Sequence, residues 1–235
     1  MKKKVLIVLK IIFFILMVAG LIGLFSWRND KKEIESILEE TNTMIKKEEI
    51  NGEVVYSYSD QYEFYNEDTV AWLIVPNTNI NYPVVQSDNN EYYLNHNYKK
   101  KKNSAGWVFL DKDNNLLSDD QNIVIYGHHR KDGIMFGDID KLMKKKYYDE
   151  NDGTIILVYA DRNDYYKIFS VYSIDSNDFY TSKNFKNFDD AIKEFEERSE
   201  IDFDEDLDNV EQILTLSTCH NNNRDRLVVQ AYRIN

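Results

Sequence analysis

Cysteine and proline are both scarce in this chain of 235 residues, which holds one Cys, Cys219, and two Pro. A chain with a single thiol cannot form an internal disulfide, which excludes the small secreted domains that depend on disulfides. So few prolines exclude a proline-rich linker protein. The hydrophobic share of 43% suits an ordinary globular core, and the length suits one sizeable domain with appendages.

Several motifs with known chemistry are also missing. The sequence has no Gly-rich phosphate loop, no G-x-S-x-G elbow, and no C-x-x-C or H-x-x-x-H spacing. Zinc remains an alternative, because Cys219-His220 and His128-His129 together offer nitrogen and sulfur ligands. Adjacent residues of a strand point to opposite faces, however, which argues against such a cluster. The sequence therefore predicts no metal and no cofactor.

Basic residues are fewer than acidic ones, 29 Lys or Arg against 41 Asp or Glu. Residues 1–30 hold five of the basic residues and one of the acidic ones, so residues 31–235 carry 24 basic and 40 acidic residues and a net charge of −16. A surface of this charge excludes a nucleic-acid partner. Solubility is the ordinary explanation of the acidity, and a cationic or amine-bearing partner is the alternative.

The N-terminus has the pattern of a membrane anchor. A basic tail, residues 1–4, precedes an apolar run over residues 5–27 that is broken only by Lys10. About twenty residues suffice to span a bilayer, and the lysines favour a cytoplasmic N-terminus. A cleaved signal peptide is the rival, but the run ends in Phe25, Ser26 and Trp27 without a small-x-small site. We expect an uncleaved single-pass anchor with the rest of the chain outside the cell.

Residues 28–58 are predicted to form a helical stalk. Ile34, Ile37, Leu38, Met44 and Ile45 follow helical spacing among many charges. A further short helix is predicted over residues 59–67. Residues 59–235 form the main domain, in which short β-rich runs between turn signals indicate a closed or nearly closed β-barrel of about eight strands. These runs are residues 70–75, 80–86, 107–110, 122–126, 154–160, 165–174, 212–217 and 227–234.

A long connection, residues 175–211, separates the predicted strand over residues 165–174 from the predicted strand that leads to Cys219. Within it Phe188, Ala191, Ile192 and Phe195 lie on one helical face, and Asn187 is placed to cap that helix. A long connection with its own helix beside a site often forms a lid or a binding wall. The alternative is a helix that only packs on the barrel.

Three residues with complementary chemistry stand at predicted strand ends. Cys219 ends the run that begins at residue 212, His128 follows the run over residues 122–126, and Arg226 opens the last run. A thiol, an imidazole and a guanidinium are the parts of a cysteine-nucleophile acyl-transfer site. The imidazole can activate the thiol and protonate a leaving amine, and the guanidinium can stabilise an oxyanion. The alternatives are a buried structural Cys and an Arg in a surface salt bridge.

These residues lie in motifs that resemble those of sortases. The sequence Thr215-Leu216-Ser217-Thr218-Cys219, followed by Arg226-Leu227-Val228-Val229, looks like the TLxTC…R signature of that family. The segment around His128, residues 125–136, resembles the histidine motif of the class B branch, and three upstream motifs fit the same branch. These are Ile125-Tyr126-Gly127-His128-His129 with Lys131-Asp132-Gly133-Ile134-Met135-Phe136, and upstream Trp72-Leu73, Tyr82-Pro83-Val84-Val85-Gln86 and Tyr93-Leu94. The similarity covers roughly residues 60–235.

The resemblance implies a mainly β fold. It implies a closed eight-stranded sortase-type β-barrel with N-terminal helices and a helical insertion before the Cys-bearing strand. Carried over by position, Cys219 is the nucleophile, His128 is the general acid and base, and Arg226 is the family arginine, with Arg224 as a near competitor. Three further residues match substrate-groove positions. These are Ser217, Asn90 and Leu94.

The resemblance also implies a function. A membrane-anchored cysteine transpeptidase on a Gram-positive-type cell surface would cleave a C-terminal sorting signal of secreted proteins at a Thr–Gly-like bond. A thioacyl-enzyme would then pass the protein to an amine of a peptidoglycan cross-bridge. Two alternatives come from other classes: a cysteine hydrolase of similar geometry with water as its acceptor, and a non-catalytic, membrane-tethered binding module with a structural thiol.

Overall fold

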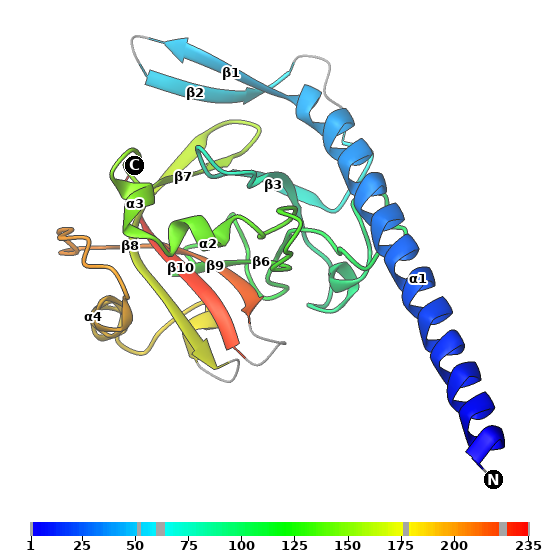
Figure 1. Ribbon diagram of the computed structural model, residues 1–235. Coiled ribbons are helices and arrows are strands. Elements are labelled where there is room, and N and C mark those ends of the chain that lie inside the picture. The colour runs from blue at the N-terminus through cyan, green and yellow to red at the C-terminus, as the bar shows by residue number, and fades with distance from the viewer. Residues whose placement is uncertain (1, 51–52, 60–63, 176–178, 221–224, 235) are drawn as a thin grey trace.

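A long N-terminal helix, a two-stranded hairpin and an eight-stranded barrel follow one another along the chain (Figure 1). The computed structural model describes residues 2–50, 53–59, 64–175, 179–220 and 225–234. Helix α1 (Lys2–Thr41) leads through a 3₁₀ turn, η1 (Asn42–Met44), into the hairpin of β1 (Ile45–Ile50) and β2 (Glu53–Tyr58).

The barrel is closed, in the order β10-β8-β7-β3-β4-β5-β6-β9. Neighbouring strands are antiparallel except for the pairs β4–β5 and β6–β9, which are parallel. The mainly β, eight-stranded barrel predicted from the sequence is thereby confirmed. Its strands are β3 (Thr69–Ile74), β4 (Asn81–Val85), β5 (Phe109–Leu110), β6 (Asn122–Gly127), β7 (Thr154–Val158), β8 (Asn163–Asp175), β9 (Ile213–His220) and β10 (Asp225–Arg233).

Alternation along the strands divides the apolar residues between two sides of the barrel wall. In β9, Leu214 and Leu216 belong to the main core inside the barrel, whereas Ile213 packs in a second cluster outside it. In β10, Val229 lies in the main core and Val228 in the outer cluster. The interior is therefore filled by side chains, and the outer face of β9 and β10 is available to other elements.

The helical part of the insertion covers this outer face. It consists of η3 (Phe179–Thr181) and α4 (Phe188–Arg198). The side chain of Asn187 accepts a hydrogen bond from the backbone N–H of Asp190, which caps α4 as predicted. The predicted apolar face of α4 buries Ala191, Ile192 and Phe195 against the outer cluster.

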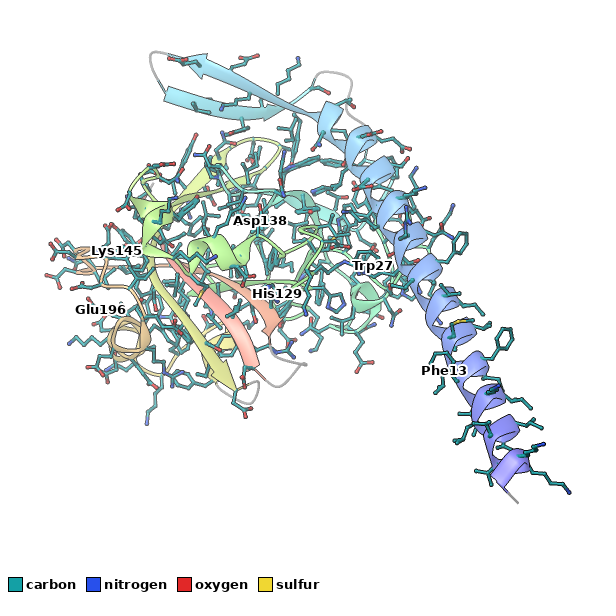
Figure 2. All side chains as sticks on the ribbon, in the orientation of Figure 1. Phe13, Trp27, His129, Asp138, Lys145 and Glu196 are labelled. Carbon is teal, nitrogen blue, oxygen red and sulfur yellow. The ribbon has the colours of Figure 1, made fainter. Side chains whose placement is uncertain are left out.

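Helix α1 has two parts with different surroundings. Apolar side chains from Val5 to Phe25 are exposed, and the helix is long and apolar enough to cross a membrane by length and composition. Figure 2 shows Phe13 on the part that extends away from the barrel and Trp27 where the helix lies beside it. Beyond Trp27, Ile34 and Ile37 are fully buried in the main core.

The predicted helical stalk over residues 28–58 is wrong in its second half. The helix ends at Thr41, and β1 and β2 form an antiparallel hairpin instead. Met44, Ile45, Tyr56 and Tyr58 of this segment pack against an apolar strip on the outside of the barrel, which favours the strands over a helix. That strip consists of Trp72, Ile74, Ile156 and Val158.

The short helix predicted over residues 59–67 is not supported either. Residues 64–68 form bends and turns, in which Asn66 is buried and its side chain donates to the carbonyl of Tyr98 at 2.8 Å. Residues 60–63 lie outside the described part of the chain. The remaining short helices are η2 (Tyr92–Leu94), α2 (Ile139–Leu142) and α3 (Lys145–Tyr148).

Candidate active site

Strand pairing brings the three predicted catalytic residues into one row. Gly127 pairs with Thr218 in the parallel ladder of β6 and β9, so His128 stands level with Cys219 one residue further on. Cys219 pairs directly with Arg226 across β9 and β10. Directly opposed residues of an antiparallel pair have Cα atoms about 4.5–5.5 Å apart and share a face of the sheet. The backbone of Cys219 is described but its side chain is not, and Arg224 lies outside the described residues.

A groove of about 240 Å³ runs along the outer face of β6, β9 and β10 beside this row. The insertion forms one wall, where the hydroxyl groups of Tyr180 and Ser217 lie 3.0 Å apart in a hydrogen bond. The groove therefore lies between the barrel and its insertion, outside the barrel. It is lined by Asn90, Leu94, Phe109, Tyr126, Gly127, His128, Tyr180, Thr181, Ser217, Thr218 and Arg226.

All three residues predicted at substrate-groove positions line this groove: Asn90, Leu94 and Ser217. Asn90 is fixed from two sides, because its amide donates to Asp111 Oδ2 at 2.8 Å and its Oδ1 accepts from the N–H of Lys112 at 2.8 Å. The hydroxyl of Tyr126 donates to the same carboxylate oxygen at 2.8 Å. The polar wall of the groove is thus held by a buried carboxylate.

The ring of His128 is oriented by the backbone. Its Nε2 lies 2.7 Å from the carbonyl oxygen of Leu94. A carbonyl only accepts, so in the neutral ring the proton resides on Nε2 and Nδ1 keeps its lone pair. This arrangement leaves Nδ1 as the nitrogen able to take up and return a proton.

The surroundings of His128 disfavour its charged form. Burial lowers the pKa of the imidazole below its ordinary value, and the positive charges of Arg130 and Arg226 lower it further. The hydrogen bond to the Leu94 carbonyl acts in the opposite direction. The ring is therefore shifted toward the neutral state, which suits a group that both accepts and donates protons.

His129 has a different environment from its neighbour. Its Nε2 lies 2.9 Å from Asp140 Oδ2, and its backbone forms an isolated bridge with Met135. Among the described residues that line the groove, His128 is present and His129 is not. The two adjacent histidines thus have different partners.

The Leu94 carbonyl is itself held in place by a tight backbone contact. Gly106 has a φ of 61°, and a Cβ at this position would lie 2.5 Å from the carbonyl oxygen of Tyr93 and 2.8 Å from that of Leu94. The N–H of Trp107 donates to the same Tyr93 carbonyl at 2.9 Å. Glycine is therefore required where this segment approaches the histidine.

Six residues that line the groove were not predicted as site residues from the sequence: Phe109, Tyr126, Gly127, Tyr180, Thr181 and Thr218. Tyr126 was detectable, because it stands two residues before His128 and alternation places both on one face. Tyr180 and Thr181 reach the groove from the insertion, and no local motif marks them. Over the described residues, no group of three or more His, Cys, Asp or Glu could hold a metal ion.

Comparisons with known proteins agree with this geometry. Residues 73–234 match the family model of the sortase domain. Sortase B of Listeria monocytogenes is 32% identical over 211 residues, which cover 86% of this chain and 85% of that protein.

Solved structures show the same fold. A crystal structure of Bacillus anthracis sortase B superposes with a TM-score of 0.73 at 28% identity, over 87% of this chain and 98% of that one. The Staphylococcus aureus sortase B crystal structure gives a TM-score of 0.67 at 30% identity, over 72% of this chain and 82% of the other. With the family motifs in order on the matching barrel, this chain belongs to the sortase family of cysteine transpeptidases, in its class B branch.

Proposed function

We propose that this class B sortase is held in the membrane by α1, cleaves a C-terminal sorting signal of secreted proteins at a Thr–Gly-like bond, and transfers them to an amine of the cell wall. The observation that carries the proposal is the strand register, which aligns His128, Cys219 and Arg226 beside one groove.

In the first half-reaction, the Cys219 thiolate attacks the carbonyl carbon of the scissile peptide bond. A carbon–sulfur bond forms, and the carbonyl oxygen becomes an oxyanion. Arg226 stands directly opposite Cys219, where a permanent positive charge favours the thiolate and stabilises the oxyanion. The carbon–nitrogen bond then breaks, and protonated His128 gives its proton to the departing amine.

In the second half-reaction, the amino group of the acceptor attacks the thioacyl carbon. His128, now neutral, takes the proton from that nitrogen, and Cys219 leaves as the thiolate. The proton that left in the first step is thereby replaced, and the enzyme returns to its starting state. Water can attack in place of the amine, which gives hydrolysis instead of transfer.

Asn90, Leu94 and Ser217 are proposed to hold the sorting signal in the groove. Asn90 and Ser217 contribute polar side chains to the groove lining, and Leu94 contributes an apolar one. A groove with few polar groups at fixed places is suited to an extended peptide whose backbone and side chains both need partners. Tyr180, which is hydrogen-bonded to Ser217, ties the insertion to this recognition surface.

The cellular placement is part of the same proposal. Residues 5–27 would cross the bilayer once, with the tail of residues 1–4 in the cytoplasm and the catalytic domain outside. Secreted substrates leave the membrane beside the enzyme in this arrangement. The acidic surface of residues 31–235 is compatible with an acceptor that carries a free amine.

The test uses the full chain in lipid nanodiscs with a quenched sorting-signal peptide, with and without an amine acceptor such as oligoglycine or a diamino-acid peptide. We expect cleavage, an amine-ligated product by mass spectrometry, and an acyl-enzyme on the Cys219 peptide. The Cys219→Ala variant should retain the fold and lose turnover. Cleavage without ligation for every acceptor would instead identify a hydrolase. No cleavage, with a thiol inert to alkylating reagents, would identify a binding module.

A further inference from the structure

The segment that follows β6 folds into a closed loop. The N–H of Phe136 donates to the carbonyl of His128 at 3.1 Å, so the two ends of the segment 128–136 lie side by side. At the tip, the N–H of Gly133 donates to the carbonyl of Arg130 at 3.1 Å. The position of His128 therefore depends on how this loop, which we call the histidine loop (residues 128–136), is held.

A buried ion pair stiffens the tip. Arg130 Nε lies 3.1 Å from Asp132 Oδ1, and its second terminal nitrogen lies 2.7 Å from Oδ2. The two side chains are only 10% and 3% exposed. A bidentate pair of this kind fixes the planes of both groups and leaves the guanidinium little freedom to move.

Helix α1 contacts this pair at the point where it leaves the apolar segment. The ring of Trp27 lies 5.8 Å from Arg130 Cζ, within the range of a cation–π interaction. Lys31, one turn further, donates from Nζ to the carbonyl of Asp132 at 3.5 Å. Trp27 and Lys31 are four residues apart, so they lie on one face of the helix. Figure 2 shows Trp27 on the stretch of α1 beside the domain.

A second set of contacts fixes the same turn of the helix to another loop. The side-chain amide of Asn103 donates to the carbonyl of Asp30 at 3.2 Å and to Glu33 Oε2 at 2.9 Å. The hydroxyl of Ser104 is hydrogen-bonded to Asp30 Oδ2. The docked turn of α1 is therefore a fixed support for the histidine loop.

We propose that Trp27 and Lys31 dock the membrane-exit turn of α1 onto the histidine loop, and that Arg130 is a positioning residue which transmits this contact to His128. The inference rests on the proposed function, because it assigns His128 the proton-transfer role. It adds that the anchor supports the catalytic geometry as well as the location of the enzyme.

The charges around His128 make the positioning role measurable. The positive charges of Arg130, on the same loop, and of Arg226, on β10, both lower the pKa of His128, and burial is the largest cause of that lowering. Asp132 pairs with Arg130, and Cys219 on β9 stands level with the ring. Removing the Arg130 charge should raise the pKa of His128 and move the alkaline limb of the pH–rate profile, where protonated His128 is lost, to higher pH.

The experiment compares variants of the full chain in nanodiscs. Arg130→Met should lower kcat/KM by about tenfold, since small misplacements of a catalytic group are costly. Arg130→Lys should keep the pH profile but restore only part of the rate. Trp27→Ala leaves the ion pair intact and should give a smaller loss that is not additive with Arg130→Met. Lys131→Met, which removes an exposed neighbouring charge, is the matched control and should stay within about twofold of the parent.

A readout without turnover separates this inference from the proposed function. In the Cys219→Ala background, the titration of the ¹³C-labelled His128 ring by NMR should shift to higher pH in Arg130→Met and change little in Lys131→Met. Arg130→Met alone leaves the buried carboxylate of Asp132 without its ion-pair partner, which would destabilise the fold. The double variant Arg130→Met with Asp132→Asn removes both charges and is the control for this effect. An unchanged titration and unchanged kcat/KM in the Arg130 variants would overturn the inference, whereas loss of all cleavage in the parent chain would overturn the function.

Discussion

At the scale of single residues, His128 and His129 show how neighbours in sequence acquire different chemistry. His128 faces the groove with its Nε2 on a backbone carbonyl, and His129 is engaged with Asp140. The two side chains are the same chemical group. The difference between them arises from position alone.

We predict that His128→Ala lowers kcat/KM for a sorting-signal peptide by about 10²–10⁴-fold, the usual contribution of a general acid and base. His129→Ala should stay within about threefold, because it loses a partly exposed hydrogen bond to Asp140 and His129 is not among the described residues that line the groove. Steady-state kinetics of both variants provide the measurement. If His129→Ala proves the more damaging substitution, the register of the site is off by one residue.

Gly106 gives a second prediction at this scale. Gly106→Ala should lower activity, because its Cβ would displace the Leu94 carbonyl that orients His128. Gly153→Ala is the matched control: Gly153 also has a positive φ, 75°, but its neighbours are Tyr148 and Ile168. Both variants should be destabilised by about 1–3 kcal/mol in chemical denaturation. Equal activity in the two variants would show that the Leu94 carbonyl does not matter.

Cys219, His128 and Arg226 could be named as candidates from the sequence because each stands at the end of a β-rich run beside a family motif. Their roles remain proposals, whereas their placement in one row follows from the ladder. Tyr180 could not be predicted in the same way. It reaches Ser217 across 37 residues of sequence through the fold of the insertion, which no local pattern encodes.

At the scale of elements, aromatic packing inside the insertion attaches α4 to η3 and to the segment between them. Phe195 is fully buried, with ring centroids 5.7 Å from Phe179 and 5.6 Å from Phe185. Phe179 directly precedes Tyr180, which lines the groove. The packing of α4 and the shape of one groove wall are therefore linked.

We predict that Phe195→Ala lowers the free energy of unfolding by about 3–5 kcal/mol, the usual cost of removing a buried aromatic ring. It should also raise KM for the sorting-signal peptide, because η3 loses its support. Leu117→Ala is the control, since Leu117 is 91% exposed. Urea denaturation and steady-state kinetics give the two values. An unchanged KM in a destabilised Phe195 variant would show that the insertion packs on the barrel without shaping the groove.

The strands of the barrel were predictable because their apolar residues alternate or run continuously between turn signals. The β1–β2 hairpin was not, because β1 is mostly charged and Ile45 also continues the helical spacing that begins at Ile34. Its conformation is decided by contacts with the distant strip that includes Trp72 and Ile156. Long-range packing of this kind overrides local propensity.

At the scale of the whole molecule, the three tryptophans have different surroundings. Trp27 is 41% exposed at the end of the apolar segment, whereas Trp72 and Trp107 are buried at 0% and 1%. Tryptophan is enriched at membrane–water interfaces, where its amphipathic ring fits the headgroup region.

We predict that brominated lipids quench part of the tryptophan fluorescence of the full chain in vesicles, and that Trp27→Phe removes the quenchable part. Trp72 and Trp107 should contribute an unquenched remainder. Fluorescence with lipids brominated at different depths provides the measurement. Quenching that persists in Trp27→Phe would place the bilayer against the barrel instead of at the end of the apolar segment.

Helix α1 continues without interruption from Lys2 to Thr41. If residues 5–27 span the bilayer, the fourteen residues from Arg28 to Thr41 form a stiff rod about 21 Å long, at 1.5 Å per residue. A rigid helix of this kind would fix the distance of the catalytic domain from the membrane surface and its orientation, which a flexible linker would not. A substrate that emerges from the membrane would then be cleaved only when the residues between its scissile bond and the lipid surface are enough to reach the groove. The length of the helix would thereby set that number of residues.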